Sequence, residues 1–541
     1  MPTPQGRLEK ITIAIISAAF VIWSAALIYH SSFVAIDGRR YFCLFDDAMI
    51  SMRYAWNLSH GIGLVWNPGE RVEGYSNLLM TLIMSLATLV FDKSTAALSI
   101  QILGAGLMLI IAYLAMRIAD HITRNETQAH QRLVRVLAFV GTLAYYPLVY
   151  WSLMGMETGL LAALVLAAVF WSLRFAETGR PDLLGLVSAC LGLAYLTRND
   201  SAIFSILVWL YVAWESRRFP DIRPAQVLKS IGLFLLFVAG QAAFRYSYYG
   251  EVLPNTYTLK LTGMPLAARI ANGVGFIRPF LFEAAVVFAI SAACLVFRFR
   301  PDKFLMFAMA GSAVVYQVYA GGDPWPYWRI MAPTMPLVLL LFSDTITALA
   351  LHASSRMAPG SEGMRASLLR GGRPAYVMAA VLVLLGLIPL DLKFYPEMLL
   401  SVKPYSAYAN ERNVNIAIAL ERVTGEDASV GVFFAGAIPY FTDRRAVDFL
   451  GKSDRYVAHL PPDLFSKVPV NGMTSLPGHN KYDLNYSIRL LEPTYVQGLK
   501  WGRQNLTKWA RSTYVKVEYE GIELILLKDS PDVLWREIYG P

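Results

Sequence analysis

The stretch YFCLFDDAMISMRY, residues 41–54, places two adjacent carboxylates, Asp46 and Asp47, shortly after a long apolar segment, Ile11–Tyr29. The chain has 541 residues, of which 56% are hydrophobic and 16% are charged, whereas an ordinary soluble domain carries about 25% charged residues. A bilayer core about 30 Å thick is crossed by about 20 apolar residues in a helix. The sequence therefore predicts a membrane protein with an acidic pair, Asp46 and Asp47, beside its first span.

Apolar segments of near-spanning length recur along the chain. The first could be a cleaved signal peptide, because a basic start precedes it, but its apolar run exceeds the usual length of roughly 7–15 residues and favours a retained span. We predict about eleven transmembrane helices, several of them short: Ile11–Tyr29, Ala97–Met116, Val136–Trp151, Gly159–Leu173, Leu183–Leu196, Ala202–Trp214, Val227–Phe244, Phe280–Phe297, Phe304–Tyr319, Met335–Leu351 and Tyr376–Leu390.

The net charge of +9 does not indicate a nucleic-acid partner, because of where the basic residues lie. They occupy every second connection between the predicted spans, at Arg7 and Lys10, Arg117 to Arg135, Arg174 and Arg180, Arg217 to Arg223, Arg298 to Lys303, and Arg356 to Arg373. This alternation is the positive-inside pattern and predicts a cytoplasmic N-terminus. The first outer loop, about residues 30–96, and everything after residue 392 are then expected on the outer side of the membrane.

Two helices are predicted within the first outer loop. Ser76–Phe91 is apolar enough to span, but counting it as a span would place positive charge outside at almost every later turn, so we predict a helix in the membrane interface. Asp46–Leu58 is predicted as a second interfacial helix, with Met49 and Met52 on one side and Arg53 on another.

The composition changes after the last predicted span. Residues 393–541 indicate a helix over Tyr408–Arg422, short strands over Ser429–Phe434 and Ala437–Phe441, and a hairpin of Tyr514–Tyr519 with Glu523–Leu527. We therefore predict a polytopic α-helical transmembrane domain over residues 1–392 and a small periplasmic α/β domain over residues 393–541.

Several kinds of protein are not indicated by the sequence. Its three cysteines, Cys43, Cys190 and Cys294, are too few for a disulfide framework. It has neither the ligand spacing of a zinc site nor a Gly-rich phosphate loop. Nothing therefore suggests a nucleotide-driven pump.

The unusual polar residues gather on the predicted outer side. They are Asp46, Asp47, Glu70, Arg71, Glu73, Glu157, Arg198, Asp200, Tyr248, Tyr249, Asn255, Lys260, Asp323 and Arg329. Sugar transfer from a polyprenyl phosphate needs a carboxylate to take the proton of the acceptor hydroxyl, and cations or a metal to stabilise the departing phosphate. A partly desolvated aspartate has a raised pKa and is a better base, while arginine and lysine bind phosphate.

Each of these residues also has a purely structural interpretation, which the residues alone leave open. The alternatives are helix capping for Asp46, Asp47 and Glu157, a local ion pair for Arg198 and Asp200, and anchoring at the membrane interface for Arg329 and the tyrosines of Tyr246–Tyr257.

An ordered set of motifs adds a resemblance to a known family. The set runs FDDAMISMRYAWNLSHGIGLVWNPGERVEGYSN, MGMETGL, LTRND, YYGEVLPNTYTLK, GGDPWPYWR and PGHNKYDLNY. It resembles the bacterial membrane glycosyltransferases of the GT-C class, and most the branch that includes the mycobacterial terminal β-(1→2) arabinofuranosyltransferase. The resemblance implies a polytopic fold, a polyprenyl-phosphate sugar as lipid donor, and a hydroxyl of a periplasmic glycan or protein as acceptor.

The resemblance also implies roles for particular residues. The catalytic base falls in the acidic pair, with Asp46 first, and His479 and Lys481 match residues that face the donor phosphate or the acceptor. With the outer-side cluster, the predicted phosphate-binding residues are Arg198, Lys260, Arg329, His479 and Lys481. The predicted acceptor or supporting residues are Glu73, Glu157, Asp200, Tyr249, Asn255 and Asp323. Asp46 and Asp47 could also hold a divalent cation, Mg²⁺ or Mn²⁺.

The sugar and even the reaction have alternatives. Arabinofuranose is the leading expectation for the sugar, with mannose, rhamnose or another hexose as rivals. The second hypothesis is a transporter or flippase of a polyprenyl-linked sugar. Such proteins carry ionisable residues near the bilayer midplane, often in duplicated halves, whereas the predicted spans hold few charges and no two halves look alike.

Overall fold

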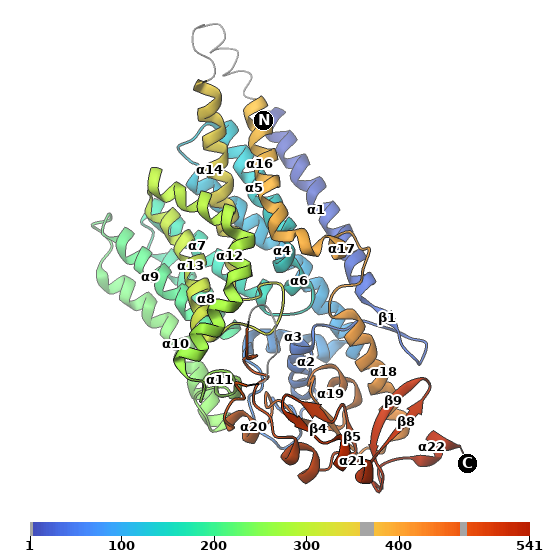
Figure 1. Cartoon of the computed structure of the whole chain (residues 1–541). Helices are drawn as coiled ribbons and strands as arrows, with labels where there is room; N and C mark the ends of the chain where they lie inside the picture. The colour runs from blue at the N-terminus through green and yellow to red at the C-terminus, as the bar shows by residue number, and fades with distance from the viewer. Residues whose placement is uncertain (1–3, 357–372, 466–472, 541) are drawn as a thin grey trace.

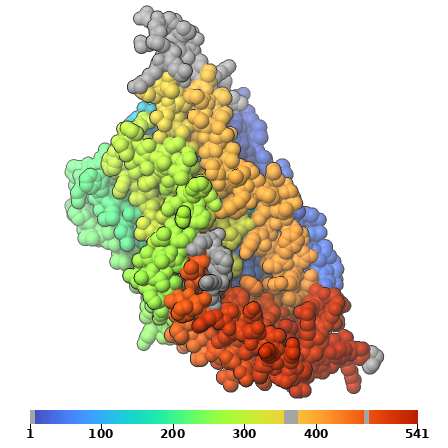
Figure 2. All heavy atoms as spheres, in the orientation of Figure 1, coloured from blue at the N-terminus to red at the C-terminus, as the bar shows by residue number. Residues whose placement is uncertain are grey.

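The computed structural model of the chain describes residues 4–356, 373–465 and 473–540. Long helices form a bundle, and the residues that follow α16 form a mixed α/β part that covers one end of it (Figure 1). The N-terminus lies at the opposite end (Figure 1). In the space-filling view the C-terminal residues, in red, lie over most of that end on the face shown (Figure 2).

Eight helices among the described residues are long and apolar enough to cross a membrane. They fall on α1 (Pro4–Ser31), α4 (Lys93–Ile122), α7 (Thr158–Thr178), α10 (Pro224–Tyr249), α12 (Leu266–Phe297), α13 (Pro301–Ala320), α14 (Met335–Arg356) and α16 (Arg373–Asp391). The chain is therefore a multi-pass membrane protein, as predicted.

The other three predicted spans are helices of a different kind. Val136–Trp151 falls on α5 (Gln128–Ala144) and α6 (Tyr146–Leu153), which bend by 54° at their junction and together could make one more span. Pro147 lies in the first turn of α6, where its missing N–H costs nothing but prevents α5 from simply continuing. The remaining two are α8 (Asp182–Thr197) and α9 (Ala202–Ser216), of 16 and 15 residues, linked by the short turn η1 (Asn199–Ser201).

The helices pack in an order that places α14 at the centre. This helix contacts α4, α5, α12, α13 and α16, and 83% of its apolar window is buried, against 22% for α1. Close approach relies on small residues, as in other membrane bundles. At Gly104 of α4, for example, a Cβ atom would lie 2.1 Å from the carbonyl oxygen of Ser152 in α6.

The first outer loop is folded between the bundle and the C-terminal part. It holds the short strands β1 (Phe33–Val34) and β2 (Arg40–Tyr41), then α2 (Asp46–Ser59) and α3 (Leu78–Val90). Helix α3 exposes Leu82, Leu86, Leu89 and Val90, the apolar face that an interfacial helix needs.

The expectation that Asp46–Leu58 lies in the membrane interface is wrong. Helix α2 is buried on nearly all sides, including its polar residues Arg53 and Asn57. The Arg53 guanidinium donates hydrogen bonds to the carbonyls of Trp66, Pro439 and Arg444. Residues far away in the sequence thus supply the partners that water would supply at an interface.

The C-terminal part is a small α/β structure, as predicted. Its five-stranded sheet has the order β4-β3-β5-β9-β8, with β3, β4 and β5 parallel and the last two strands antiparallel. The strands are β3 (Ser429–Val432), β4 (Arg445–Asp448), β5 (Tyr495–Val496), β8 (Tyr514–Tyr519) and β9 (Ile522–Leu527), and a smaller pair joins β6 (Lys500–Trp501) to β7 (Gln504–Asn505).

The helices of this part are short apart from α18. They are α17 (Tyr395–Met398), α18 (Ala407–Val423), α19 (Ala437–Thr442), α20 (Arg455–His459), α21 (Thr507–Thr513) and α22 (Trp535–Tyr539). The strand predicted over Ala437–Phe441 is wrong, because this segment is α19. All of its residues are buried, and it packs on α2 and α18, so tertiary contacts override a short apolar pattern that periodicity cannot resolve.

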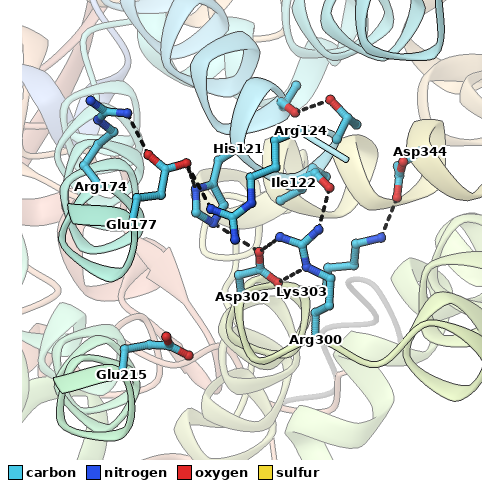
Figure 3. Close-up of polar contacts among 12 residues, drawn as sticks. His121, Ile122, Arg124, Arg174, Glu177, Glu215, Arg300, Asp302, Lys303 and Asp344 are labelled. Carbon is cyan, nitrogen blue, oxygen red and sulfur yellow. Dashed lines mark hydrogen bonds and ion pairs between the residues drawn. The ribbon is translucent and has the colours of Figure 1, made fainter. Parts of the chain in front are cut away.

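A buried polar network crosses the far end of the bundle, opposite the C-terminal part, where α4 ends and α13 begins (Figure 3). His121 lies 2.6 Å from Glu177 and 3.2 Å from Asp302. Close by, Lys303 Nζ lies 2.7 Å from Asp344 Oδ2. These contacts join the ends of α4 and α7 to the start of α13 and to α14.

Candidate active site

A cavity of about 540 Å³ opens where the bundle meets the C-terminal part. Its walls come from the junction of α8 and α9, from α10 and α13, from the short helix α11 (Asn255–Leu261) and from the loop before α14. Its lining includes the apolar side chains of Ala202, Ile203, Val238, Val252 and Leu253. It also includes the charged side chains of Arg198, Asp200, Arg245, Lys260, Asp323 and Arg329.

Three predicted phosphate-binding cations therefore line the same cavity, but their surroundings differ. Arg198 lies between Glu157, at 2.7 Å, and Asp200, at 2.6 Å. Arg329 is buried and lies 3.0 Å from Asp323, so it is not an anchor at the membrane interface. Both guanidiniums are held by carboxylates in fixed orientations toward the cavity.

Lys260 differs because it has no such partner. Among the described residues its ammonium makes neither a hydrogen bond nor an ion pair. Burial, followed by the charge of Arg329, lowers the pKa of Lys260 to about 8. An anion in the cavity would relieve both effects. Lys260 is thus the cation most available to a phosphate.

The acidic pair begins α2 but does not cap it, since Phe45 is the N-cap and no side-chain capping bond is made. Asp47 Oδ2 instead accepts hydrogen bonds from Trp325 Nε1 at 2.9 Å and from Arg329 at 3.1 Å, while its Oδ1 pairs with Lys452. Although burial opposes ionisation, Lys452 and Arg329 hold the pKa of Asp47 well below its usual range. Asp47 is therefore a fixed anion that orients two cations.

Asp46 has a different environment from its neighbour. Its Oδ1 accepts a hydrogen bond from the backbone N–H of Ala437, at 3.2 Å, and the backbone N–H of Gly436 also stabilises the charged carboxylate. Burial raises the pKa of Asp46 to about 6, and the charge of Asp47 adds to this while Lys452 opposes it. Adjacent carboxylates with pKa values pushed apart are typical of sites that divide electrostatic and proton-transfer roles.

Sequence reasoning missed two cations of the site, Lys452 and Arg245. Arg245 of α10 holds the buried carboxylate of Glu73 at 2.8 Å, and burial raises the pKa of Glu73 to about 7. The only local signal for Lys452 is the sequence DFLGKS after a strand, in which an Asp can fold back on its own backbone.

The remaining predicted residues support the site and do not line the cavity. Glu157 receives Arg198 and also the side-chain amide of Asn77 at 3.1 Å, and makes no capping bond to α7. Tyr249 Oη donates to the carbonyl of Leu64 at 2.8 Å. Asn255 Nδ2 donates to the carbonyls of Gly451 and Lys452.

The two residues predicted from the PGHNKYD motif also lie beside the cavity. Lys481 Nζ donates to the carbonyls of Thr258, at 2.9 Å, and Ala458, at 2.7 Å, and so fastens α11 to α20. The His479 ring meets Trp325 edge-on, with centroids 5.4 Å apart, and burial lowers its pKa to about 3. The neutral imidazole thus packs behind the tryptophan that binds Asp47.

The residues present do not fit the two-carboxylate metal site that was expected. Within residues 4–356, 373–465 and 473–540, no group of three or more His, Cys, Asp or Glu side chains could hold a metal ion. Both oxygens of Asp47 are already bonded to Lys452, Arg329 and Trp325. Positive charge at this site is supplied by side chains.

Comparisons of sequence give two partial matches. The family described as "Domain of unknown function (DUF8728)" matches residues 405–524. The terminal β-(1→2)-arabinofuranosyltransferase of Corynebacterium glutamicum is 26% identical over 240 residues, which is 40% of this chain and 32% of that protein. The match thus spans about a third of the relative's own length.

Comparisons of structure cover nearly the whole chain. ArnT from Cupriavidus metallidurans, solved bound to undecaprenyl phosphate, superposes with a TM-score of 0.56 at 12% identity, over 96% of this chain and 98% of ArnT. The Archaeoglobus fulgidus oligosaccharyltransferase tethered with an acceptor peptide gives a TM-score of 0.53 at 11% identity, over 96% of this chain and 74% of that one. The chain therefore has the GT-C fold, as the resemblance predicted.

Proposed function

We propose that this protein is a GT-C glycosyltransferase that moves a sugar from a polyprenyl phosphate to a hydroxyl of an acceptor. The observation that carries the proposal is a cavity lined by both apolar side chains and cations, one of which, Arg329, contacts Asp47 of the acidic pair. A lipid-linked phosphate has the same two parts. The undecaprenyl phosphate bound by ArnT supports this class of donor.

The donor would lie with its polyprenyl chain along Val238, Val252 and Leu253 and with its phosphate near Arg198, Lys260 and Arg329. Arg198 and Arg329 are already oriented by carboxylates, so they would stabilise the departing phosphate without reorganising. Lys260 would gain its ionic partner from the donor. Charge-assisted hydrogen bonds of this kind are among the strong ones.

Asp46 is proposed as the general base that takes the proton of the acceptor hydroxyl. Its raised pKa makes it a better base than an exposed carboxylate, and its carboxylate makes no ion pair within the described residues, only hydrogen bonds from the backbone of Gly436 and Ala437. Asp47 is excluded from this role by its bonds to Lys452, Arg329 and Trp325 and would act as an electrostatic support.

Arabinofuranose is the proposed sugar, supported by the Corynebacterium relative, and mannose, rhamnose and other hexoses are the alternatives. The acceptor would be a periplasmic glycan or protein. The orientation that fits is the one predicted from the basic loops, with the cavity and the C-terminal part on the periplasmic face of the inner membrane.

The test uses the full chain in proteoliposomes with radiolabelled decaprenyl-phosphate arabinose, decaprenyl-phosphate mannose and an alkyl glycoside acceptor. We expect transfer from one donor and its loss by 10²-fold or more in Asp46→Asn. Asp443→Asn is the matched control, because Asp443 also pairs with buried cations of this end, Arg53 and Lys93, but lies away from the cavity. Unchanged transfer by Asp46→Asn would overturn the base, and lipid movement across the bilayer without any glycoside formed would overturn the transferase.

A further inference from the structure

One cation of the C-terminal part, Lys452, contacts the acidic pair. Lys452 follows β4, its side chain is 13% exposed, and the carboxylate that it contacts is Asp47. The two residues are 405 positions apart. The α/β part thus supplies a positive charge to a site most of whose other residues come from the bundle and its first loop.

The loop that carries Lys452, residues Asp448–Asp454, is ordered by its own hydrogen bonds. The Asp448 carboxylate accepts hydrogen bonds from the backbone N–H groups of Leu450 at 3.0 Å, Gly451 at 3.1 Å and Ser453 at 2.7 Å. Gly451 has φ +79°, with the side chain of Val457 where a Cβ would lie, so the turn requires glycine. The backbone on both sides of Lys452 is therefore fixed.

The same loop is fastened to the cavity wall and to the first loop. Asn255, at the start of α11, donates to the carbonyls of Gly451 and Lys452 at 2.9 Å each. At Gly74 a Cβ atom would lie 2.9 Å from the carbonyl oxygen of Lys452. The backbone of Lys452 is thus held against α11, which also carries Lys260, and lies close to Gly74 of the first loop.

We propose that Lys452 is a positioning residue of the transferase site, which neutralises Asp47 so that Asp46 can be ionised beside it and act as the base. This inference rests on the proposed function. Two adjacent carboxylates without a counter-charge cannot both ionise easily. Arg329 alone would not neutralise Asp47, because its guanidinium is also paired with Asp323.

The charges that surround the pair come from several elements. Those facing Asp46 are Asp47 of α2, the thiol of Cys43 before it and Lys452, and those facing Asp47 are Lys452, Arg329, Lys260 of α11 and His479. Of these, Lys452 is the cation that acts on both carboxylates. Its removal should therefore raise the pKa of Asp46, whereas removal of the Asp47 charge should lower it.

The experiment compares Lys452→Met, Lys452→Arg and Asp47→Asn in proteoliposomes. We expect the acidic limb of kcat/KM against pH to move up by about one unit or more in Lys452→Met, to return toward wild type in Lys452→Arg, and to move down in Asp47→Asn. Lys93→Met is the matched control, because Lys93 also joins the bundle to the C-terminal part, through Asp443 at 2.5 Å, but does not contact the acidic pair. It should leave the profile unchanged.

A second readout separates this inference from the proposed function. Infrared difference spectra of the full chain against Asp46→Asn report the titration of the Asp46 carboxylate without any sugar donor. A shift in opposite directions for Lys452→Met and Asp47→Asn supports the inference even if no donor tested is turned over. A titration of Asp46 that is the same in wild type, Asp47→Asn and a folded Lys452 variant overturns it. If Lys452→Met does not fold, an unshifted Asp47→Asn overturns it alone.

Discussion

Replacement of Asp344 by Asn should destabilise the protein strongly, although Asp344 lies at the far end of the bundle from the cavity. Its carboxylate is 1% exposed and lies 2.7 Å from Lys303 Nζ and 2.8 Å from His130 Nε2. The substitution keeps the volume but removes the counter-charge of Lys303, whose other polar contact is the Cys294 thiol at 3.5 Å. An uncompensated buried charge costs about 3–5 kcal/mol, so the free energy of unfolding should fall by about that amount.

The assay is unfolding of the full chain in mixed detergent micelles with increasing dodecyl sulfate, followed by tryptophan fluorescence. Asp182→Asn is the matched control, because Asp182 also pairs with a cation, Arg180, but the two side chains are 58% and 65% exposed and such pairs contribute little. The control should unfold as wild type does.

Two results would refute the reasoning. One is an Asp344→Asn curve that coincides with the Asp182→Asn curve. The other is a double variant, Lys303→Met with Asp344→Leu, that is less stable than Asp344→Asn. Removing both charges should lower the free energy of unfolding less than leaving Lys303 charged without a partner. The reason is that apolar residues of similar volume avoid the desolvation cost of a buried ion pair.

Three further predictions concern the candidate site. Transfer should rise with pH through about 6 and level off above it, because Asp46 must be ionised to accept a proton and its pKa is raised to about 6; a rate that is flat between pH 5 and 8 would contradict its role. Lys260→Met should weaken binding of decaprenyl phosphate about 10- to 100-fold, the worth of one charge-assisted hydrogen bond, measured by quenching of tryptophan fluorescence, whereas Lys393→Met outside the cavity should bind normally. Gly436→Ala should lower both Tm and activity, since a Cβ there would lie 2.1 Å from the carbonyl oxygen of Asp46 and overpacking costs about 1–3 kcal/mol; wild-type activity with an unchanged Tm would show that the contact is not tight.

Much of the fold could be predicted because its causes are local. Each predicted span falls on helical residues, because the length of an apolar run and its helical period depend only on consecutive residues. The hairpin of β8 and β9 was also predictable, because two β-rich runs flank Glu520 and Gly521, and both of these residues adopt positive φ in the turn. By contrast, the burial of α2 depends on Pro439 and Arg444, which bond to Arg53 from nearly 400 residues away.

The residues of the candidate site were easier to predict than the hydrogen bonds and ion pairs that connect them. Topology alone brought Arg198, Lys260 and Arg329 to one side of the membrane, and in the structure all three line the same cavity. The sequence could not assign Glu157 to Arg198 or Glu73 to Arg245, because pairing depends on distances between separate helices. Nor could it show that Lys481 binds two carbonyls and lies outside the cavity.

By itself, the sequence determined a multi-pass helical protein with an acidic pair after its first span and cations in the loops of the same side. The hydrophobicity and charge of a residue determine whether it prefers lipid or water. These preferences can be taken from the sequence without knowing which residues are in contact. Only the tertiary structure decided how the two carboxylates differ: Asp47 is paired with Lys452 and Arg329, whereas Asp46 accepts hydrogen bonds from the backbone of Gly436 and Ala437. The physical reason is that a carboxylate's pKa depends on burial and on charges a few ångströms away, and here the deciding charge, Lys452, arrives from 405 residues further along the chain.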